Sequence, residues 1–357
     1  MTAVVAESAD AVEIAAGGSS WTWRASRAVA VAVGITAAVL LLVWLVTGVD
    51  PATTLTQFVE GSVGDSRAIA RTLVRATPLA LVGLGATVAI RGGVINVGGE
   101  GQMAIGAIGA VLAVQALGSG APGLLIWIAA IVAGALGGAA WAIVPAALAA
   151  TRGVSEILST LLMNLITVSL LLYLLELPLF ADPNPNVITP QGKPIPDAAV
   201  LPTIWPDTAL HAGVLVAIAA MAGCWWWQRS PGSVRVDLVG ANPNLAAQSG
   251  LRPRRARTRL LLVSAAFAGV AAAVQLLGVS LRVTTGLTGG IGYTGVLVAV
   301  LGGRTPVGTV AAAVAFAALV GGGESLEFEG VPRSIVVLVQ AVAVIVVALG
   351  AARRRAR

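Results

Sequence analysis

The sequence predicts an all-α polytopic membrane protein, with about ten transmembrane helices in two inverted five-helix halves. Composition is the first observation: 57% of the 357 residues are hydrophobic and only 11% are charged, whereas soluble domains carry about 25% charged residues. The second is that apolar runs recur along the chain at about the 20-residue length that crosses a bilayer as a helix. The third is that each half contains a Gly-rich interruption at a matching position, which predicts Gly-broken segments within the helical bundle.

Ten apolar runs are candidates for these helices. The first, 28–49, follows a polar segment, 1–27, that lacks the basic start of a cleavable signal peptide, so we expect a disordered tail there and a retained first helix. The other candidates are 76–90, 100–117, 122–150, 155–177, 209–228, 259–281, 287–303, 306–322 and 332–350. The runs 76–90 and 287–303 are too short to cross the bilayer alone unless flanking residues extend them. Residues 28–357 are thus expected to form a single transmembrane domain.

The basic residues predict the orientation. With ten spans both termini lie on one side, and if that side is the cytoplasm, 16 of the 22 Lys and Arg residues lie inside and 6 outside, as the positive-inside rule expects. Arg67, Arg71 and Arg75 are exceptions on the outer side. Their spacing of four puts them on one helix face, so we expect an amphipathic helix at the outer interface, the alternative being a span drawn too short.

Two long loops connect the predicted spans, and the spans form two halves of opposite orientation. Residues 178–208 are rich in proline and predict an ordered or extended outer loop, whereas 229–258 form a basic cytoplasmic loop. The spans divide into halves, 28–177 and 209–350, and five spans in each half invert the second relative to the first.

The Gly-rich interruptions, residues 91–102 and 284–295, each follow the second span of a half. Paired breaks of this kind point to a transport pathway, because the backbone groups that they free must be satisfied by protein or by water. The alternative is that both segments are merely loops.

The sequence shows no sign of an enzyme. It has no phosphate-binding loop of the form GxxxxGK[ST], and so no ATP site of its own. A single cysteine, Cys224, and a single histidine, His211, argue against a metal cluster or a nucleophile–histidine–acid set. We expect His211 at a membrane interface. The net charge of +6 comes mostly from arginines on the inner face, so nucleic acid is not an expected partner.

Four sequence strings carry a family resemblance. Asn96-Val-Gly-Gly-Glu-Gly-Gln102 resembles the N-I-G-x-E-G-Q signature of ABC importer permeases for simple sugars, nucleosides and branched-chain amino acids. Three further strings resemble stretches of the same branch in the same order: Ser155 to Asn164, Gly240 to Gly250, and Gly292 to Gly303 with the following Pro306. The last string, together with Gly330-Val-Pro332, is most similar to nucleoside-type permeases. Ser155 stands where Asn is common in this branch. This departure affects the assignment of the substrate more than the assignment of the family.

The resemblance implies a permease subunit that forms the translocation pathway for a nucleoside or a simple sugar in a bacterial cell (inner) membrane, with both termini cytoplasmic. It implies that ATP and Mg are used by separate ATP-binding cassette subunits and that this chain binds no cofactor. It further implies a second permease subunit, as a heterodimer, and a substrate-binding lipoprotein. The alternatives are a stand-alone secondary transporter of a small polar solute and a branched-chain amino acid permease.

The basic loop contains a predicted short helix. Asn242 suits the N-cap and Pro243 the first turn, Ala246 and Ala247 continue the helix, and Gly250 ends it. The resemblance implies that this is the coupling helix that docks on the ATP-binding subunit, whereas the alternative is a plain connecting helix.

Polar residues near the interruptions are the candidates for the translocation pathway. Glu100 lies at a helix start, where it either stabilises the helix N-terminus or belongs to the pathway, and Asn96 is placed to cap the same helix. Asn164 and Gln275 lie inside apolar helices, as interhelical hydrogen bonds or as substrate contacts. Glu156 is expected to pair locally with Arg152. The pathway candidates are Asn96, Glu100, Gln102, Asn164, Gln275, Gly289, Gly290 and Tyr293.

Overall fold

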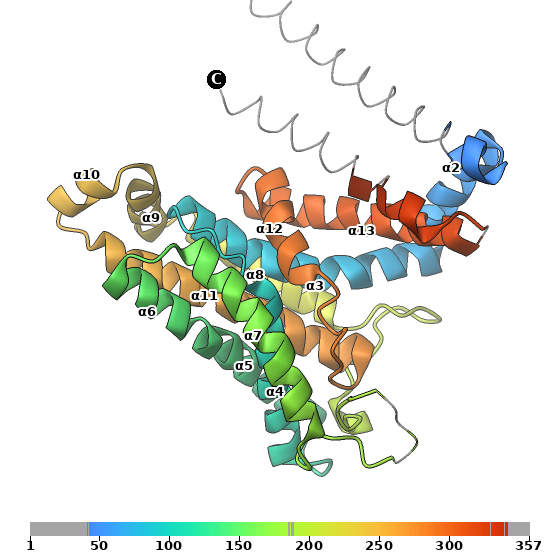
Figure 1. The fold of residues 1–357 in the computed structure, drawn as a ribbon, viewed down its shortest axis with the longest axis horizontal. Coiled ribbons are helices and arrows are strands. Elements are labelled where there is room, and N and C mark those ends of the chain that lie inside the picture. Colours follow the sequence, from blue (N-terminus) through green and yellow to red (C-terminus); the bar gives the residue numbers. More distant parts are fainter. Residues whose placement is uncertain are drawn as a thin grey trace, which may run out of the picture. The chain divides into compact units, whose positions relative to one another are not determined.

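The computed structural model describes residues 41, 43–184, 186, 189–328, 330–338 and 340–341, and within them the chain is helical, with only isolated β-bridges (Figure 1). Among these residues, six helical segments are long and apolar enough to span a membrane: Ser66–Arg91, Gly99–Leu117, Gly123–Arg152, Glu156–Glu176, Pro253–Ser280 and Pro306–Phe328. Two shorter apolar helices are Gly213–Trp227 and Ile291–Leu301. The all-helical class is confirmed. The count of ten and the division into halves remain predictions, because most of 28–49 and of 332–350 lies outside the described residues, as does the tail 1–27.

The chain divides into two compact units, residues 63–319 and residues 1–62 with 320–357. In the second unit, α2 (Pro51–Val59) begins at Asp50, whose carboxylate accepts hydrogen bonds from the backbone N–H groups of Ala52 and Thr53. Carboxylate capping at the N-cap stabilises a helix start. A π-helical turn, Glu60–Gly64, follows α2. The sequence prediction had no helix in this region.

Helix α3, Ser66–Arg91, corrects the prediction for the arginine-rich segment. Asp65 caps it through a 2.6 Å hydrogen bond from the backbone N–H of Ala68, and the helix then runs through Pro78 without a break. Its 26 residues give a length of about 39 Å at 1.5 Å per residue, enough to cross a bilayer core. Arg67, Arg71 and Arg75 thus belong to the first turns of this helix and do not form a separate interfacial helix.

The next four helices are α4 (Gly99–Leu117), α5 (Gly123–Trp141), α6 (Ile143–Arg152) and α7 (Glu156–Glu176). The predicted span 122–150 is two helices that meet at Ala142. Helices α4, α5 and α11 pack closely because glycines face one another: a Cβ atom on Gly106 or Gly134 would lie within 2.7 Å of the backbone of Gly269. Small residues of this kind permit close approach of membrane helices.

The remaining helices are α8 (Gly213–Trp227), α9 (Pro231–Ala241), α10 (Pro243–Gln248), α11 (Pro253–Gln275), α12 (Ile291–Leu301) and α13 (Pro306–Phe328); a π-helical turn, Leu276–Ser280, extends α11. The basic loop therefore holds two helices where one was predicted. Figure 1 shows α9 and α10 together at one end of the bundle, beside the start of α11. Helix α3 ends where α11 begins, since Gly92 packs on Leu260, so these two neighbours are antiparallel.

The proline-rich loop, residues 178–208, is ordered by main-chain hydrogen bonds to the segment that follows α11. Gly192 N–H donates to the Val283 carbonyl at 2.7 Å, and Leu201 N–H donates to the Leu277 carbonyl at 2.9 Å. A 3-10 turn, Asp197–Ala199, lies between these contacts. Its described residues are thus held in place by main-chain hydrogen bonds, whereas its position on the outer side stays a prediction.

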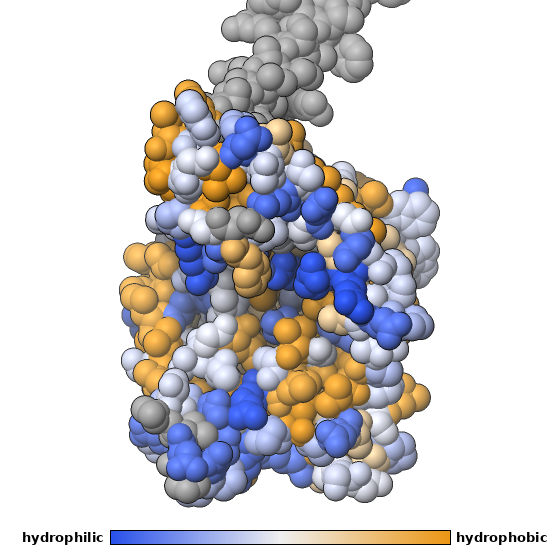
Figure 2. Space-filling model, turned by 90° about the vertical axis from the view of Figure 1, so that its right-hand side faces the viewer, coloured by the Kyte–Doolittle hydropathy of each residue, from blue (hydrophilic) through white to orange (hydrophobic). Residues whose placement is uncertain are grey.

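Many large hydrophobic side chains lie on the surface of the described residues. Large hydrophobic side chains such as Leu124, Leu136 and Leu165 are more than 60% exposed, and Figure 2 shows apolar patches over the visible face with hydrophilic groups between them. Contiguous apolar surface suits a chain whose helices contact lipid or other membrane subunits.

Candidate functional site

The two Gly-rich interruptions meet in the bundle. Gly99, in the first turn of α4, and Gly292, in the first turn of α12, are so close that a Cβ atom on Gly99 would lie 2.8 Å from the Gly292 carbonyl oxygen. Glu100 Oε1 accepts a 2.6 Å hydrogen bond from the backbone N–H of Gly292. The carboxylate of one broken helix therefore caps the N-terminus of the other, where a negative charge is favoured.

Asn164, from the middle of α7, ties the first interruption to the second. Its Oδ1 accepts a hydrogen bond from the Gly101 N–H at 3.0 Å, and its Nδ2 donates to the Val97 carbonyl at 2.9 Å and to the Tyr293 hydroxyl at 3.0 Å. One buried amide thus satisfies a free N–H of α4, a loop carbonyl and a side chain of α12. Of the two predicted roles of Asn164, the interhelical hydrogen bond is observed; substrate contact stays a prediction.

Asn96 and Gln102 form a reciprocal amide pair. Asn96 Nδ2 donates to Gln102 Oε1 at 2.7 Å, and Gln102 Nε2 donates to Asn96 Oδ1 at 3.0 Å. Asn96 also donates to Ser264 Oγ of α11 and accepts from the Gly98 N–H. The N-cap of α4 is Gly98, without a side-chain cap, so Asn96 orders the turn before the helix and is not its N-cap.

These three hydrogen-bonded sets involve neighbouring residues at the starts of α4 and α12, and we call them together the polar junction: Asn96, Glu100, Gln102, Asn164, Ser264, Gly292 and Tyr293. It contains five of the eight predicted pathway residues. Gly289 and Gly290 lie beside it and adopt positive φ angles of 49° and 84° in the turn that starts α12. Gln275 is not joined to the junction: it is the last residue of α11, and its side chain makes no hydrogen bond to any residue that the structure describes.

Sequence reasoning missed Ser264 and Trp141. Ser264 is a small polar residue inside an apolar helix, the same signal that singled out Asn164. Trp141 closes α5, and its indole N–H is buried without an acceptor among the described residues. It lies 3.0 Å from where a Cβ atom on Gly101 would stand, beside the junction.

The short helix of the basic loop forms as predicted. Asn242 Oδ1 accepts a 3.0 Å hydrogen bond from the Leu245 N–H, Pro243 occupies the first turn, and Gly250 ends the segment at φ 80°. Ala246 is buried against the neighbouring helices, while Leu245 and Ala247 are exposed. Helix α10 thus presents a small apolar surface at the end of the bundle.

An ion pair links α9 to the start of the first interruption. Arg91 donates through Nε to Asp237 Oδ1 at 2.8 Å and through Nη2 to Asp237 Oδ2, and it also donates to Ser233 Oγ at 3.1 Å. Its guanidinium stacks over Trp227, 5.9 Å from the ring centroid. Gly240 packs directly on the Arg91 and Gly92 backbone, with no room for a side chain. Asp237 is the one acidic residue in 229–258, a signal that sequence reasoning overlooked.

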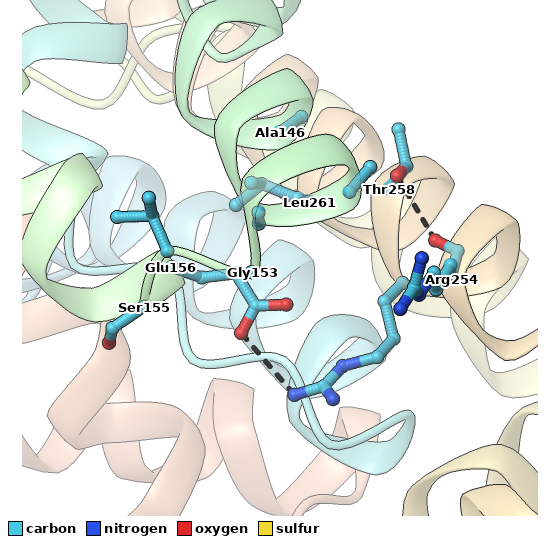
Figure 3. Close-up of a pocket in the computed structure, with 11 residues that line it drawn as sticks. Ala146, Gly153, Ser155, Glu156, Arg254, Thr258 and Leu261 are labelled. Carbon is cyan, nitrogen blue, oxygen red and sulfur yellow. Dashed lines mark hydrogen bonds and ion pairs between the residues drawn. The ribbon is translucent and has the colours of Figure 1, made fainter.

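A second ion pair corrects the prediction for Glu156. Its partner is Arg257 of α11, at 3.3 Å, and not Arg152. Arg257 also donates to the Gly93 carbonyl at 2.9 Å. Both residues line a pocket of about 240 Å³ between α6, α7 and α11 (Figure 3).

His211, which was predicted to lie at a membrane interface, is buried within the protein. It precedes α8, is 2% exposed, and accepts a hydrogen bond from the Gly213 N–H through Nδ1. Burial lowers the pKa of its imidazole below 6.5, because desolvation disfavours the charged form. No group of three or more His, Cys, Asp or Glu side chains is placed to hold a metal ion within the described part of the chain.

Membrane-length helices around a buried cluster of polar groups at two helix breaks define a polytopic membrane protein of the transport class. Residues 68–350 match the model of a family described as branched-chain amino acid transport system / permease component. The chain belongs to this permease family.

Three relatives are similar over most of their length. The guanosine ABC transporter permease protein NupP of Bacillus subtilis is 30% identical, over 90% of this chain and 91% of the relative. The glucose ABC transporter permease protein TsgB13 of Haloferax volcanii is 32% identical, over 76% and 74%. The nucleoside ABC transporter permease protein NupB of Lactococcus lactis is 26% identical, over 86% of each. No solved structure matches the chain.

Proposed function

We propose that this chain is the membrane-spanning permease subunit of an ABC importer that moves nucleosides. The observation that carries the proposal is the polar junction, in which both Gly-rich interruptions meet among neutral amides and a single carboxylate held by a backbone N–H. Neutral hydrogen-bonding groups suit an uncharged polar solute. The family, and the names of the guanosine and nucleoside relatives, support the same substrate class.

Tyr293 is the residue that favours a nucleoside within this class. Its hydroxyl accepts a hydrogen bond from Asn164, yet the residue is 43% exposed, and we infer that one face of its ring is open to a solute. Stacking on such a face is worth about 1–3 kcal/mol per nucleobase. Simple sugars are the second candidate, because one relative is named as a glucose permease.

The energy source in this proposal is a pair of separate ATP-binding subunits, with ATP and Mg bound there. Helix α10 is the docking element, since its exposed small residues sit on a helix fixed by Asn242 and Gly250. The Arg91–Asp237 ion pair then connects that element to the first interruption. A second permease chain and a substrate-binding lipoprotein complete the proposed assembly. The 16 to 6 distribution of basic residues supports an orientation with both termini in the cytoplasm.

The test is uptake in proteoliposomes that contain this chain, its second permease and the ATP-binding subunits. We expect ATP-dependent uptake of labelled guanosine, in preference to glucose and leucine. Tyr293→Ala is expected to lower guanosine uptake roughly tenfold, while Tyr173→Ala, an exposed tyrosine on α7, leaves it unchanged. Uptake that needs neither ATP nor the ATP-binding subunits would instead identify a secondary transporter.

A further inference from the structure

A second set of polar groups surrounds the pocket of about 240 Å³ at the end of the bundle that carries α9 and α10. Three helix ends form its walls: the last turn of α6, the first turn of α7 and the first turns of α11. Figure 3 shows Glu156 joined to an arginine across the pocket, with Arg254 on the opposite wall. The pocket is smaller than typical small-molecule sites of roughly 300–1,000 Å³, so it suits a compact group.

The charges around this pocket favour an anion. Arg254 and Arg257 both line it, against the single carboxylate of Glu156. The Arg254 guanidinium makes no hydrogen bond or ion pair within the described part of the chain. Arg257 uses Nη2 for Glu156 and for the Gly93 carbonyl, but its Nε–H is buried without an acceptor. The side-chain pairing of Arg257 is therefore incomplete, and the pair of arginines carries one positive charge more than the single carboxylate offsets.

The start of α7 adds to the same preference. Ser155 is the N-cap, but its side chain makes no capping hydrogen bond, so the first N–H groups of α7 keep no side-chain partner at this wall. Free N–H groups at a helix N-terminus carry partial positive charge. The α11 wall thus carries the two arginines, and the α7 wall carries these N–H groups beside the single carboxylate of Glu156.

The surroundings identify the source of the anion. Ala150, Val154 and Leu261 supply apolar lining, and the helices beside the pocket expose large apolar side chains. Ile143 on α6 is 56% exposed and Leu158 on α7 is 53% exposed. In a membrane permease, apolar surface that adjoins a basic helix end matches a lipid whose acyl chains lie along the helices and whose headgroup reaches the arginines.

We propose that this pocket binds the phosphate headgroup of an anionic phospholipid, with Arg254 and Arg257 as its cationic contacts. The proposed lipid site involves neither the transported solute nor the ATP-binding subunits, so its test is separate from the test of the proposed function. Inorganic phosphate offers the same chemistry without acyl chains, and the experiment separates the two.

The experiment is native mass spectrometry of the full-length chain, titrated with phosphatidylglycerol or with phosphatidylcholine of identical acyl chains. We expect preferential retention of phosphatidylglycerol. Arg254→Gln is expected to weaken that binding roughly fivefold, the effect of one basic residue near an anionic lipid surface. Arg255→Gln is the matched control: Arg255 is exposed on the same turn of α11 but does not line the pocket, and we expect no change.

A steric variant tests the pocket without altering charge. Ala150→Phe fills it while every arginine remains, and we expect it to weaken phosphatidylglycerol binding as Arg254→Gln does. Equal losses of phosphatidylglycerol binding in Arg254→Gln and Arg255→Gln, or full binding in Ala150→Phe, would contradict a defined site. Either result would indicate diffuse attraction of the lipid to the basic helix. Displacement of phosphatidylglycerol by excess inorganic phosphate would overturn the lipid as occupant, and we expect none.

Discussion

The non-helical part of the first interruption, between the end of α3 at Arg91 and the start of α4 at Gly99, is anchored at both ends, but by different chemistry. At one end Arg91 pairs with Asp237, and the two side chains are 16% and 46% exposed. At the other end Asn96 is 3% exposed and bonds only to neutral groups, Gln102, Ser264 and a backbone N–H. We call these the charged anchor and the neutral anchor.

The difference follows from the cost of taking charges out of water. A half-exposed ion pair keeps part of its hydration, whereas a buried pair loses several kcal/mol per ion that mutual attraction does not always return. Neutral amides avoid most of that penalty when every donor and acceptor is paired. The interruption therefore joins a partly exposed end to a desolvated end beside the proposed pathway.

The largest expected effect on stability and uptake comes from replacing Asn164, which lies next to the neutral anchor. In Asn164→Leu the Gly101 N–H, the Val97 carbonyl and the Tyr293 hydroxyl all lose their partner. A buried polar group left unpaired costs about 1–3 kcal/mol, so we expect a loss of about 3 kcal/mol or more in unfolding free energy and no measurable uptake. Thermal unfolding in detergent measures the first. Leu165→Ala, on the exposed side of α7, is the control and is expected to change little; equal stability of the two variants would contradict the junction's structural role.

A large effect on transport without one on stability is expected at α10. Ala247→Arg places a long charged side chain on an exposed position, so folding is unaffected, but docking on the ATP-binding subunit is obstructed. We expect uptake to fall at least tenfold. A tenfold loss corresponds to a docking interaction weakened by roughly 1.4 kcal/mol. Pull-down of the ATP-binding subunit and uptake are measured together. Asn244→Arg is the control for added charge, because it places the same charge on the same helix. Unchanged transport in the Ala247 variant would contradict the docking assignment.

The charged anchor is expected to show a smaller effect that charge reversal repairs. Asp237→Asn removes the ion pair but keeps the shape, and a bidentate pair at this exposure is worth about 1 kcal/mol or less. We expect uptake to fall severalfold while ATP hydrolysis continues. The double variant Arg91→Asp with Asp237→Arg is expected to restore part of the uptake.

Arg235→Gln is the control for this pair, because Arg235 is exposed on α9 and makes no ion pair among the described residues. If Asp237→Asn transports as well as Arg235→Gln, the charged anchor does not carry motion from α9 to the interruption. The two anchors would then differ in chemistry only, and not in role.

The smallest expected effect concerns His211, which belongs to neither anchor. Since burial holds its pKa below 6.5, the unfolded chain takes up the proton first as the pH falls, so folded-state stability is full above about pH 6.5 and declines below it. We expect the melting temperature to fall between about pH 7 and about pH 5.5, and the decline to be smaller in His211→Asn. A pH dependence that is identical in both proteins would show that other groups cause it.

Much of the architecture could be predicted from the sequence because it depends on local signals. The apolar runs located the helices, and Asn242, Pro243 and Gly250 marked the start and end of α10 through contacts within a few residues. Hydropathy alone placed the start of α3 ten residues too late, because the arginines of its first turns are polar while Asp65, the actual cap, lies just before them. Hydropathy also merged α5 and α6 into one span, 122–150, because both helices are apolar, although Pro145 lies in the first turn of α6.

The sequence by itself determined which residues are polar within an apolar helical bundle and where the chain breaks. Only the tertiary structure decided how those residues pair. Glu100 bonds a backbone group 192 positions away, and Arg91 bonds a carboxylate 146 positions away, whereas local reasoning offered Glu156 the nearby Arg152 and was wrong. Helix periodicity and capping act over one or two turns, but the partner of a buried polar group is set by which helices pack together, and that is a property of the whole fold.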